Sequence, residues 1–141
     1  RVYTLLGDGE IQEGQVWEAA MFAGFRKLDN LVVIVDNNGL QIDGPVDQVC
    51  SPYPINEKFK AFNFHVVDLA DGNDMDQNPA AFADERNHEG HPTAIIAHTV
   101  KGKGVSFMEN QVGWHGKAPN DEEYAIAMED LKKEGEALCQ K

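Results

Sequence analysis

Two short apolar runs, each followed by a polar motif, most constrain how this chain can fold. Residues 2–6 lead into Gly7-Asp8-Gly9, and residues 31–35 lead into Asp36-Asn37-Asn38. One helix-length segment separates the two runs, which predicts a βαβ unit with parallel strands. Parallel strands end at the same edge of the sheet, where ligands of open α/β folds bind. We therefore expect Asp8 and Asn38 to lie close together in the folded protein.

The side chains of these two motifs suit a hard cation that carries phosphate. Mg²⁺ prefers oxygen ligands, takes one or two protein carboxylates, and fills its other positions with phosphate and water. Neighbouring glycines let backbone N–H groups approach an anion. The motifs thus predict a magnesium–diphosphate site, with Asp8 as the charged ligand and Asn38 as the neutral one. The alternative is that Asp8-Gly9 forms an ordinary turn, and the second motif at the next strand end favours the site.

The remaining chain continues the alternation of helix and strand. Further strands are expected over 63–69 and 93–98, and further helices over 55–62, 78–90 and from Asn120, where Glu123 completes a capping-box pattern. Segments 39–54 and 99–119 read as loops. The helix over 12–28 is expected to face the sheet with Trp17, Ala20, Met21, Gly24, Phe25 and Leu28. We predict a single domain over 1–141, with a doubly wound, mostly parallel α/β sheet and helices on both faces.

Charge and composition exclude several classes of protein. The net charge is −12, so no basic stripe is available to neutralise nucleic-acid phosphates. No apolar stretch approaches the ~18 residues that a membrane span requires, and we expect a cytoplasmic protein. The two cysteines are too few for a disulfide framework. Because Arg1 leads directly into an expected buried strand, we expect a piece of a longer polypeptide, incomplete at its N-terminus.

Several motifs resemble the thiamine-diphosphate domain of transketolases, and most closely the separate N-terminal subunit of two-gene bacterial transketolases. The resemblance rests on Gly7-Asp8-Gly9-Glu10-Ile11-Gln12-Glu13-Gly14, Glu18-Ala19-Ala20, residues 31–38, Ile42-Asp43-Gly44, residues 98–104 and Trp114-His115-Gly116. It covers most of residues 1–119. It implies the thiamine-diphosphate-binding fold, with thiamine diphosphate and Mg²⁺ as cofactors and Ca²⁺ or Mn²⁺ as alternative metals.

The resemblance also implies a role for individual residues around the cofactor. The side chains of Asp8 and Asn38 and the carbonyl of Leu40 would bind the metal. The N–H groups of Gly9 and Asn38 would contact the diphosphate, and Ile42 would pack near the thiazolium ring. His115 matches the histidine that reaches the diphosphate and the substrate. Its alternative interpretation is a hydrated loop histidine.

Two acidic residues and four histidines carry weaker indications. Glu13 and Glu18 match carboxylates near the contact between subunits, and Glu13 is taken as a catalytic and cofactor-binding candidate. The alternative for both is an acidic first helical turn, which favours the helix dipole. The histidines without a family match are expected to be structural: His65, His88, His91 and His98.

By the same resemblance, the parent protein would be an enzyme that transfers a two-carbon ketol unit between sugar phosphates. The glutamate that activates the cofactor would come from a separate C-terminal subunit with the pyrimidine domain. The protein would then be an obligate hetero-oligomer, and this chain alone would be inactive. The alternatives are deoxyxylulose-phosphate synthase, dihydroxyacetone synthase, a keto-acid dehydrogenase subunit, or a non-catalytic α/β scaffold domain.

Overall fold

A computed structural model describes residues 1–76, 78–86 and 89–139, with the backbone alone for 84–86. The chain divides into two compact units, Arg1–Thr99 and Val100–Lys141. Each unit has its own internal packing and is described by itself. The single domain expected over 1–141 therefore stays a prediction.

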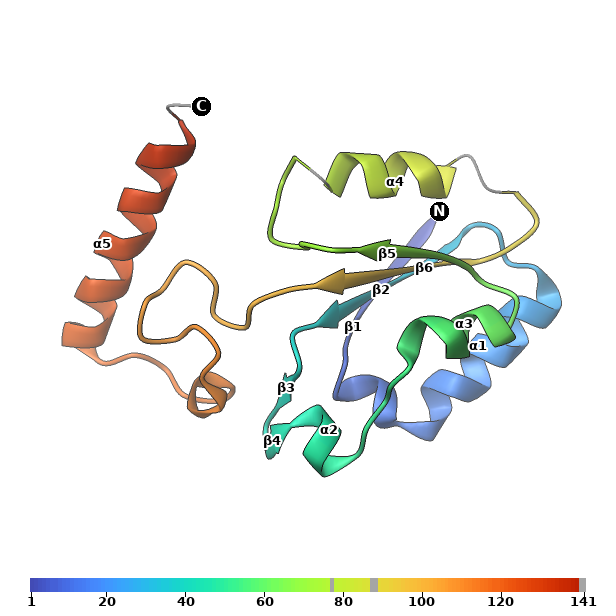
Figure 1. Cartoon of the computed structure of the whole chain (residues 1–141), viewed down its shortest axis with the longest axis horizontal. Helices are drawn as coiled ribbons and strands as arrows, with labels where there is room; N and C mark the ends of the chain where they lie inside the picture. Colours follow the sequence, from blue (N-terminus) through green and yellow to red (C-terminus); the bar gives the residue numbers. More distant parts are fainter. Residues whose placement is uncertain (77, 87–88, 140–141) are drawn as a thin grey trace. The chain divides into compact units, whose positions relative to one another are not determined.

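The first unit is built on a four-stranded sheet with the spatial order β1-β2-β6-β5 (Figure 1). The strands are β1 (Val2–Gly7), β2 (Leu31–Asn37), β5 (His65–Leu69) and β6 (Thr93–His98). All three neighbouring pairs are parallel. The four expected strands are therefore confirmed. Because they are parallel, their carboxyl ends lie at one edge of the sheet.

The first strand is less buried than expected. β1 stands at the end of the strand order, and Val2, Tyr3 and Leu5 are exposed. A strand at the end of a sheet has a hydrogen-bonded neighbour on one side only. The expectation that residues 2–6 form a buried strand is corrected to this extent.

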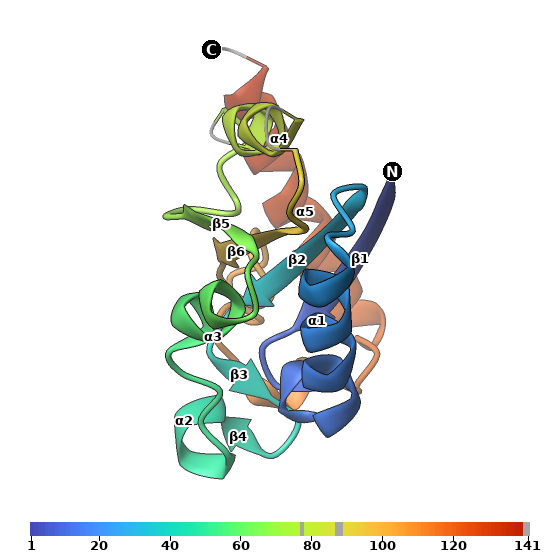
Figure 2. The ribbon, with the colours of Figure 1, turned by 90° about the vertical axis from the view of Figure 1, so that its right-hand side faces the viewer.

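Helices cover both faces of this sheet. Helices α1 (Gly14–Arg26) and α3 (Ile55–Ala61) lie on one face, and α4 (Asn78–Arg86) lies on the other (Figures 1 and 2). The connections through α1 and α3 run across the sheet in one direction, and the connection through α4 runs back. Because crossovers between parallel strands are right-handed, reversing the direction places the helix on the opposite face. The predicted doubly wound α/β fold is confirmed.

Alternate residues of the central strands supply the two cores. On β2, Val33 and Val35 pack toward α1 and α3, where Phe59 is fully buried. Val32, one position away, belongs to the second core with Ala81 of α4. This alternation follows from the period of two along a strand. It explains why β2 reads as an uninterrupted aliphatic run rather than as an alternating one.

The segment expected to be a long loop contains short elements. After β2 come an antiparallel pair, β3 (Leu40–Gln41) and β4 (Gly44–Pro45), and then the short helix α2 (Val46–Val49). The loop prediction for 39–54 is corrected to this extent. Elements of two to four residues are too short to leave a periodic apolar pattern by which they could be predicted.

The buried face of α1 is the expected one in part, because Ala20 and Gly24 are buried and Trp17 and Leu28 pack against the core. A 3-10 turn, η1 (Glu10–Gln12), precedes the helix, and α1 begins only at Gly14. Met21 is 56% exposed and Phe25 is 77% exposed, so neither faces the sheet. The buried positions are Ala20, Ala23 and Gly24. Small residues let the helix lie close to the sheet and α3, and larger side chains at these positions would hold it away.

The second unit contains η2 (Val112–Trp114) and α5 (Asp121–Leu138). The predicted capping box is confirmed, because Asn120 accepts from the Glu123 N–H and the Glu123 carboxylate accepts from the Asn120 N–H. The loop before α5 is tied to it by Ser106, whose backbone N–H and hydroxyl both donate to Asp130. These hydrogen bonds hold the pKa of the Asp130 carboxyl below its ordinary value.

Gly24 is the position in α1 where a side chain has no room. A Cβ there would lie 1.7 Å from the carbonyl oxygen of Phe62. We expect Gly24→Ala to lower the free energy of unfolding by about 1–3 kcal/mol or more, because backbone must shift to admit the methyl group. Urea unfolding measures this loss. Gly14→Ala in the same helix meets nothing within 4 Å and is the control. Equal effects of the two changes would contradict the packing.

Candidate functional site

The Asp8 carboxylate lies at the point where β1 and β2 end. Its side chain is 1% exposed. Oδ1 accepts from the N–H of Gly9 at 2.8 Å, and Oδ2 accepts from the N–H of Gly39 at 2.5 Å. The Asp8 N–H donates to the carbonyl of Asp36 at 3.1 Å. The buried carboxylate of Asp8 thus connects the ends of β1 and β2. It contacts Gly39, the residue that follows Asn38.

The turn after β2 has a defined conformation. The Asn38 side-chain oxygen accepts from the N–H of Leu40 at 3.1 Å, and Gly39 adopts a positive φ of 77°, which glycine tolerates best. The Val46 N–H donates to the carbonyl of Gly39 at 3.0 Å. The N–H of Gly39 therefore points toward Asp8, and the carbonyl of Gly39 points toward the start of α2.

Close packing limits the space beside Gly9. A Cβ at Gly9 would lie 2.7 Å from the Cβ of Gln41. The Gln41 side-chain oxygen is buried and has no hydrogen-bond partner among the described residues. Buried polar atoms of this kind call for an explanation such as a water molecule or an ion.

Negative charge accumulates at this edge of the sheet. Burial, followed by the charges of Asp8 and Asp47, raises the pKa of the Tyr53 phenol above its ordinary value of 10.0. Tyr53 therefore keeps its proton and donates to the side-chain oxygen of Asn37 at 2.8 Å. The electrostatic effect of Asp8 thus reaches the loop before α3.

The ends of β5 and β6 add polar groups that the sequence analysis did not assign to the site. His98 contacts Asn37 and Asp68, and the Thr99 hydroxyl donates to Asp36. Asn37 and His98 are partners in the parallel register. The signal that could have found this pair is a polar residue at the end of each strand, but only once the two strands are known to be neighbours.

The other predicted site residues are distributed over both units. Leu40 is half-buried in β3, and Ile42 is exposed between β3 and β4. Glu13 is the exposed N-cap residue of α1, and Glu18 is exposed within that helix. Their roles stay predictions.

Four of the five histidines lie within the described residues. His115 belongs to the second unit, where it is exposed at the end of η2, and its role stays a prediction. Of the histidines expected to be structural, His91 hydrogen-bonds to the carbonyl of Asn63 and His98 bonds within the first unit. His88 lies outside the described residues.

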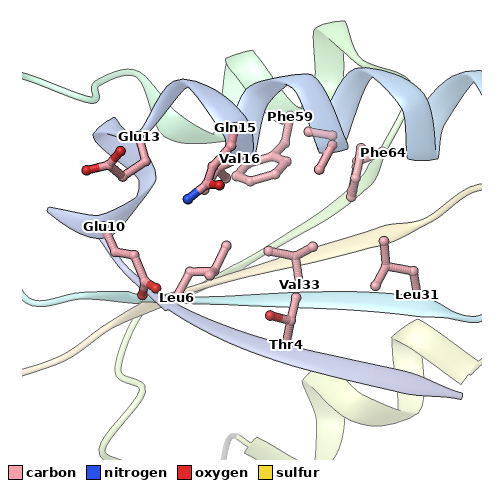
Figure 3. A pocket seen from close by; sticks show the side chains of 12 residues that line it. Thr4, Leu6, Glu10, Glu13, Gln15, Val16, Leu31, Val33, Phe59 and Phe64 are labelled. Atoms are coloured by element: carbon pink, nitrogen blue, oxygen red, sulfur yellow. The ribbon is translucent and has the colours of Figure 1, made fainter.

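A pocket of about 730 Å³ lies between α1 and the sheet (Figure 3). Apolar side chains from both elements line it, together with Glu10, Glu13 and Gln15. Of the predicted site residues, it includes Glu13. The polar groups at the strand ends therefore form a separate feature from this pocket.

Two further properties concern the described part of the chain as a whole. Within it, no three His, Cys, Asp or Glu side chains are grouped so that they could hold a metal ion. The predicted ligand set combines one carboxylate, one amide and one carbonyl, so it does not require such a group. In residues 1–76, 78–86 and 89–139, no helix has the length and apolar character needed to cross a membrane.

Comparison with known proteins gives the family. The family model described as transketolase, thiamine diphosphate binding domain, matches residues 1–136. The chain belongs to this family. The predicted resemblance is therefore confirmed, and it extends over both units.

Relatives of this transketolase-family chain include subunits and larger enzymes. The chain is 41% identical over 134 residues to the 6-deoxy-6-sulfo-D-fructose transketolase subunit SqwG of Clostridium sp. (strain MSTE9), and this covers 95% of the chain and 48% of that subunit. It is 40% identical over 134 residues to one subunit of the apulose-4-phosphate transketolase of Actinobacillus succinogenes, again 95% of the chain and 48% of the relative. The chain thus spans about half the length of these relatives.

Solved transketolases share the fold. The transketolase of Campylobacter jejuni superposes with a TM-score of 0.86 at 32% identity, covering 94% of this chain and 20% of that one. The transketolase of Pichia stipitis in complex with sedoheptulose 7-phosphate superposes with a TM-score of 0.76 at 25% identity, covering 98% of this chain and 24% of that one. The arrangement of strands and helices is therefore that of transketolases.

The pKa of Tyr53 provides a test of the charge at the sheet edge. Because its folded-state pKa is raised, the protonated phenol stabilises the fold below pH 10.0, and this stability is lost as pH rises through the folded-state pKa. We expect Asp8→Asn to lower the Tyr53 pKa, since it removes one of the charges. The phenolate absorbance, taken as a difference against Tyr53→Phe, gives the value. Asp121→Asn at the start of α5 is the control. An unchanged Tyr53 pKa in Asp8→Asn would contradict this effect of charge.

Proposed function

We propose that this chain binds Mg²⁺ and the diphosphate of thiamine diphosphate within a transketolase-type subunit. The side chains of Asp8 and Asn38 and the carbonyl of Leu40 hold the metal. The N–H groups of Gly9 and Asn38 contact the diphosphate. Ile42 packs near the thiazolium ring. The side chains of Glu13 and His115 act on the cofactor and the substrate.

The observation that carries the proposal is the buried Asp8 carboxylate beside the turn from Asn38 to Leu40. Burying a carboxylate is costly unless hydrogen bonds or an opposite charge compensate for it. Two backbone N–H groups provide part of that compensation. A divalent cation would stabilise the carboxylate further, and Asp8 and the neighbouring turn from Asn38 to Leu40 supply the oxygen donors that such a cation prefers.

Two neighbouring features fit a hydrated metal ion that carries diphosphate. The unpartnered Gln41 oxygen is an acceptor that a metal-bound water would satisfy. Gly9 has no side chain that could block the approach of an anion to its backbone. In this structure the Gly9 N–H donates to the Asp8 carboxylate. To contact the diphosphate, this N–H must leave Asp8 or be shared between the two acceptors.

The activity proposed for the whole protein is two-carbon ketol transfer between sugar phosphates. When bound, thiamine diphosphate supplies the carbanion chemistry, and the protein supplies binding, orientation and electrostatics. Within this chain, Asp8 and the turn from Asn38 would hold the diphosphate end of the cofactor. Relatives named as transketolase subunits support a separate partner chain, and we assign the pyrimidine domain to that chain.

Cofactor binding tests the metal role. In the complete subunit joined to its partner, we expect Asp8→Asn to weaken binding of thiamine diphosphate with Mg²⁺ by about a hundredfold, since a buried charge pair is broken. Isothermal titration calorimetry measures the affinity. Chelation of the metal by EDTA should produce a similar loss in the unchanged protein. Asp121→Asn is the matched control. Unaltered binding by Asp8→Asn would remove the metal role.

The reaction is tested separately by product analysis. We expect the reconstituted enzyme to transfer a two-carbon unit from a ketose phosphate to an aldose phosphate, with a product two carbons longer than the acceptor. Mass spectrometry with an isotope-labelled donor identifies that product. Binding of the cofactor without any such product would retain the site and reject ketol transfer.

A further inference from the structure

A line of side-chain hydrogen bonds crosses the carboxyl edge of the sheet next to the proposed ligands. The Tyr53 hydroxyl donates to Asn37 Oδ1 at 2.8 Å, and Asn37 Nδ2 lies 3.2 Å from His98 Nδ1. His98 Nε2 lies 2.8 Å from Asp68 Oδ1. Asn56 Nδ2 donates to the other oxygen of Asp68 at 3.3 Å. The line joins the loop before α3 with the ends of β2, β6 and β5.

The direction of each bond in this line is determined. Asn37 uses its oxygen to accept from Tyr53, so it presents its NH₂ group to His98. Nδ1 of His98 must then be the acceptor, and the ring proton lies on Nε2, which donates to Asp68. All donors point from the phenol toward the carboxylate. Hydrogen bonds aligned in one direction polarise and strengthen one another.

In this arrangement His98 connects Asn37 to Asp68. Both of its ring nitrogens are engaged, so neither is available as an acid or base toward a substrate. Its side chain is 48% exposed, whereas Asn37 in the centre is 7% exposed. The carbonyl of Asn37 also accepts from the Thr99 N–H at 3.3 Å. The network therefore holds Asn37 by both its backbone and its side chain.

We propose that Tyr53, Asn37, His98 and Asp68 are positioning residues, which fix the turn from Asn38 to Leu40 for metal and diphosphate binding. The inference rests on the proposed function. Asn37 is the last residue of β2, and the turn begins at the next residue. Fixing Asn37 fixes the direction in which the chain enters that turn.

The physical reason is the precision that a metal site needs. Ligands must be held within about 0.5 Å of their productive positions, by neighbours whose own side chains are fixed. The turn itself contains Gly39, which gives it conformational freedom. Anchoring on β5, β6 and the Tyr53 loop removes part of that freedom before the metal arrives. The network thereby lowers the loss of conformational entropy that opposes binding.

The test compares single variants of the complete subunit joined to its partner. We expect Tyr53→Phe to weaken binding of thiamine diphosphate with Mg²⁺ by about fivefold, the effect of one hydrogen bond. His98→Leu, which removes both ring nitrogens, should weaken it by about tenfold or more. His98→Asn restores an acceptor toward Asn37 and should recover part of the loss. Calorimetry measures the affinities, and Tyr124→Phe is the control. Equal affinities of His98→Leu and His98→Asn would overturn the proposal.

Melting temperature separates positioning from a structural role. Tyr53 is 40% exposed and His98 is half-exposed, so we expect the cofactor-free variants to melt within about 2 °C of the unchanged protein. Lower melting temperatures with unchanged affinity would instead indicate a structural role and overturn the inference.

The double variant tests whether the residues act as one network. Tyr53 and His98 are connected through Asn37. Breaking the line at both places should therefore cost less affinity than the product of the two single losses. Losses that multiply would show independent residues and contradict the network.

Failure of this inference can be told from failure of the proposed function. If Asp8→Asn abolishes binding and Tyr53→Phe leaves it unchanged, the metal site stands and the positioning network is rejected. If Asp8→Asn leaves binding unchanged, the proposed function itself is rejected, and the network loses the role assigned to it.

Discussion

The Asp8 carboxylate is the interaction on which the sheet edge depends. It lies in the interior, where a charge is poorly solvated, and accepts from the N–H groups of Gly9 and Gly39. These two amides come from residues that follow different strands. The carboxylate therefore joins β1 to the turn after β2, and it is also the group best suited to a divalent cation. In the function that we propose, the same side chain serves both the fold and the metal site.

Parallel strands make this meeting possible. In a parallel sheet every strand ends at the same edge, so residues far apart in sequence become neighbours there. The structure brings together Asp8 after β1, Asn37 at the end of β2 and His98 at the end of β6. The helices cover both faces of the sheet and leave this edge to loops. Polar groups can gather at the edge without disturbing either apolar core.

The pocket under α1 and the polar edge offer different chemistry. The pocket is mainly apolar, with Glu10, Glu13 and Gln15 among its lining residues. The edge has a buried carboxylate, a turn with oriented amides and an unpartnered Gln41 oxygen. Charged ligands need convergent polar groups more than they need volume. The edge is therefore the feature to which we assign the proposed metal and diphosphate, whereas the pocket supplies an apolar surface.

The sequence alone determined the four parallel strands, the longer helices and the two motifs, because these depend on local patterns. Aliphatic runs, the Gly-Asp-Gly and Asn-Asn motifs and the Asn120–Glu123 capping box are each visible within a few residues.

Tertiary structure decided which strands are neighbours and which side of α1 is buried. Neither strand's own sequence shows that β2 and β6 are neighbours in the sheet. The contact between Asn37 and His98 and the hydrogen bond from Tyr53 could therefore not be predicted. Met21 and Phe25 fit the helical period together with Ala20 and Gly24, yet both are exposed, and Ala23 is buried although it was not predicted to be. Strand order and helix rotation follow from packing between distant segments, and a local pattern does not contain that information.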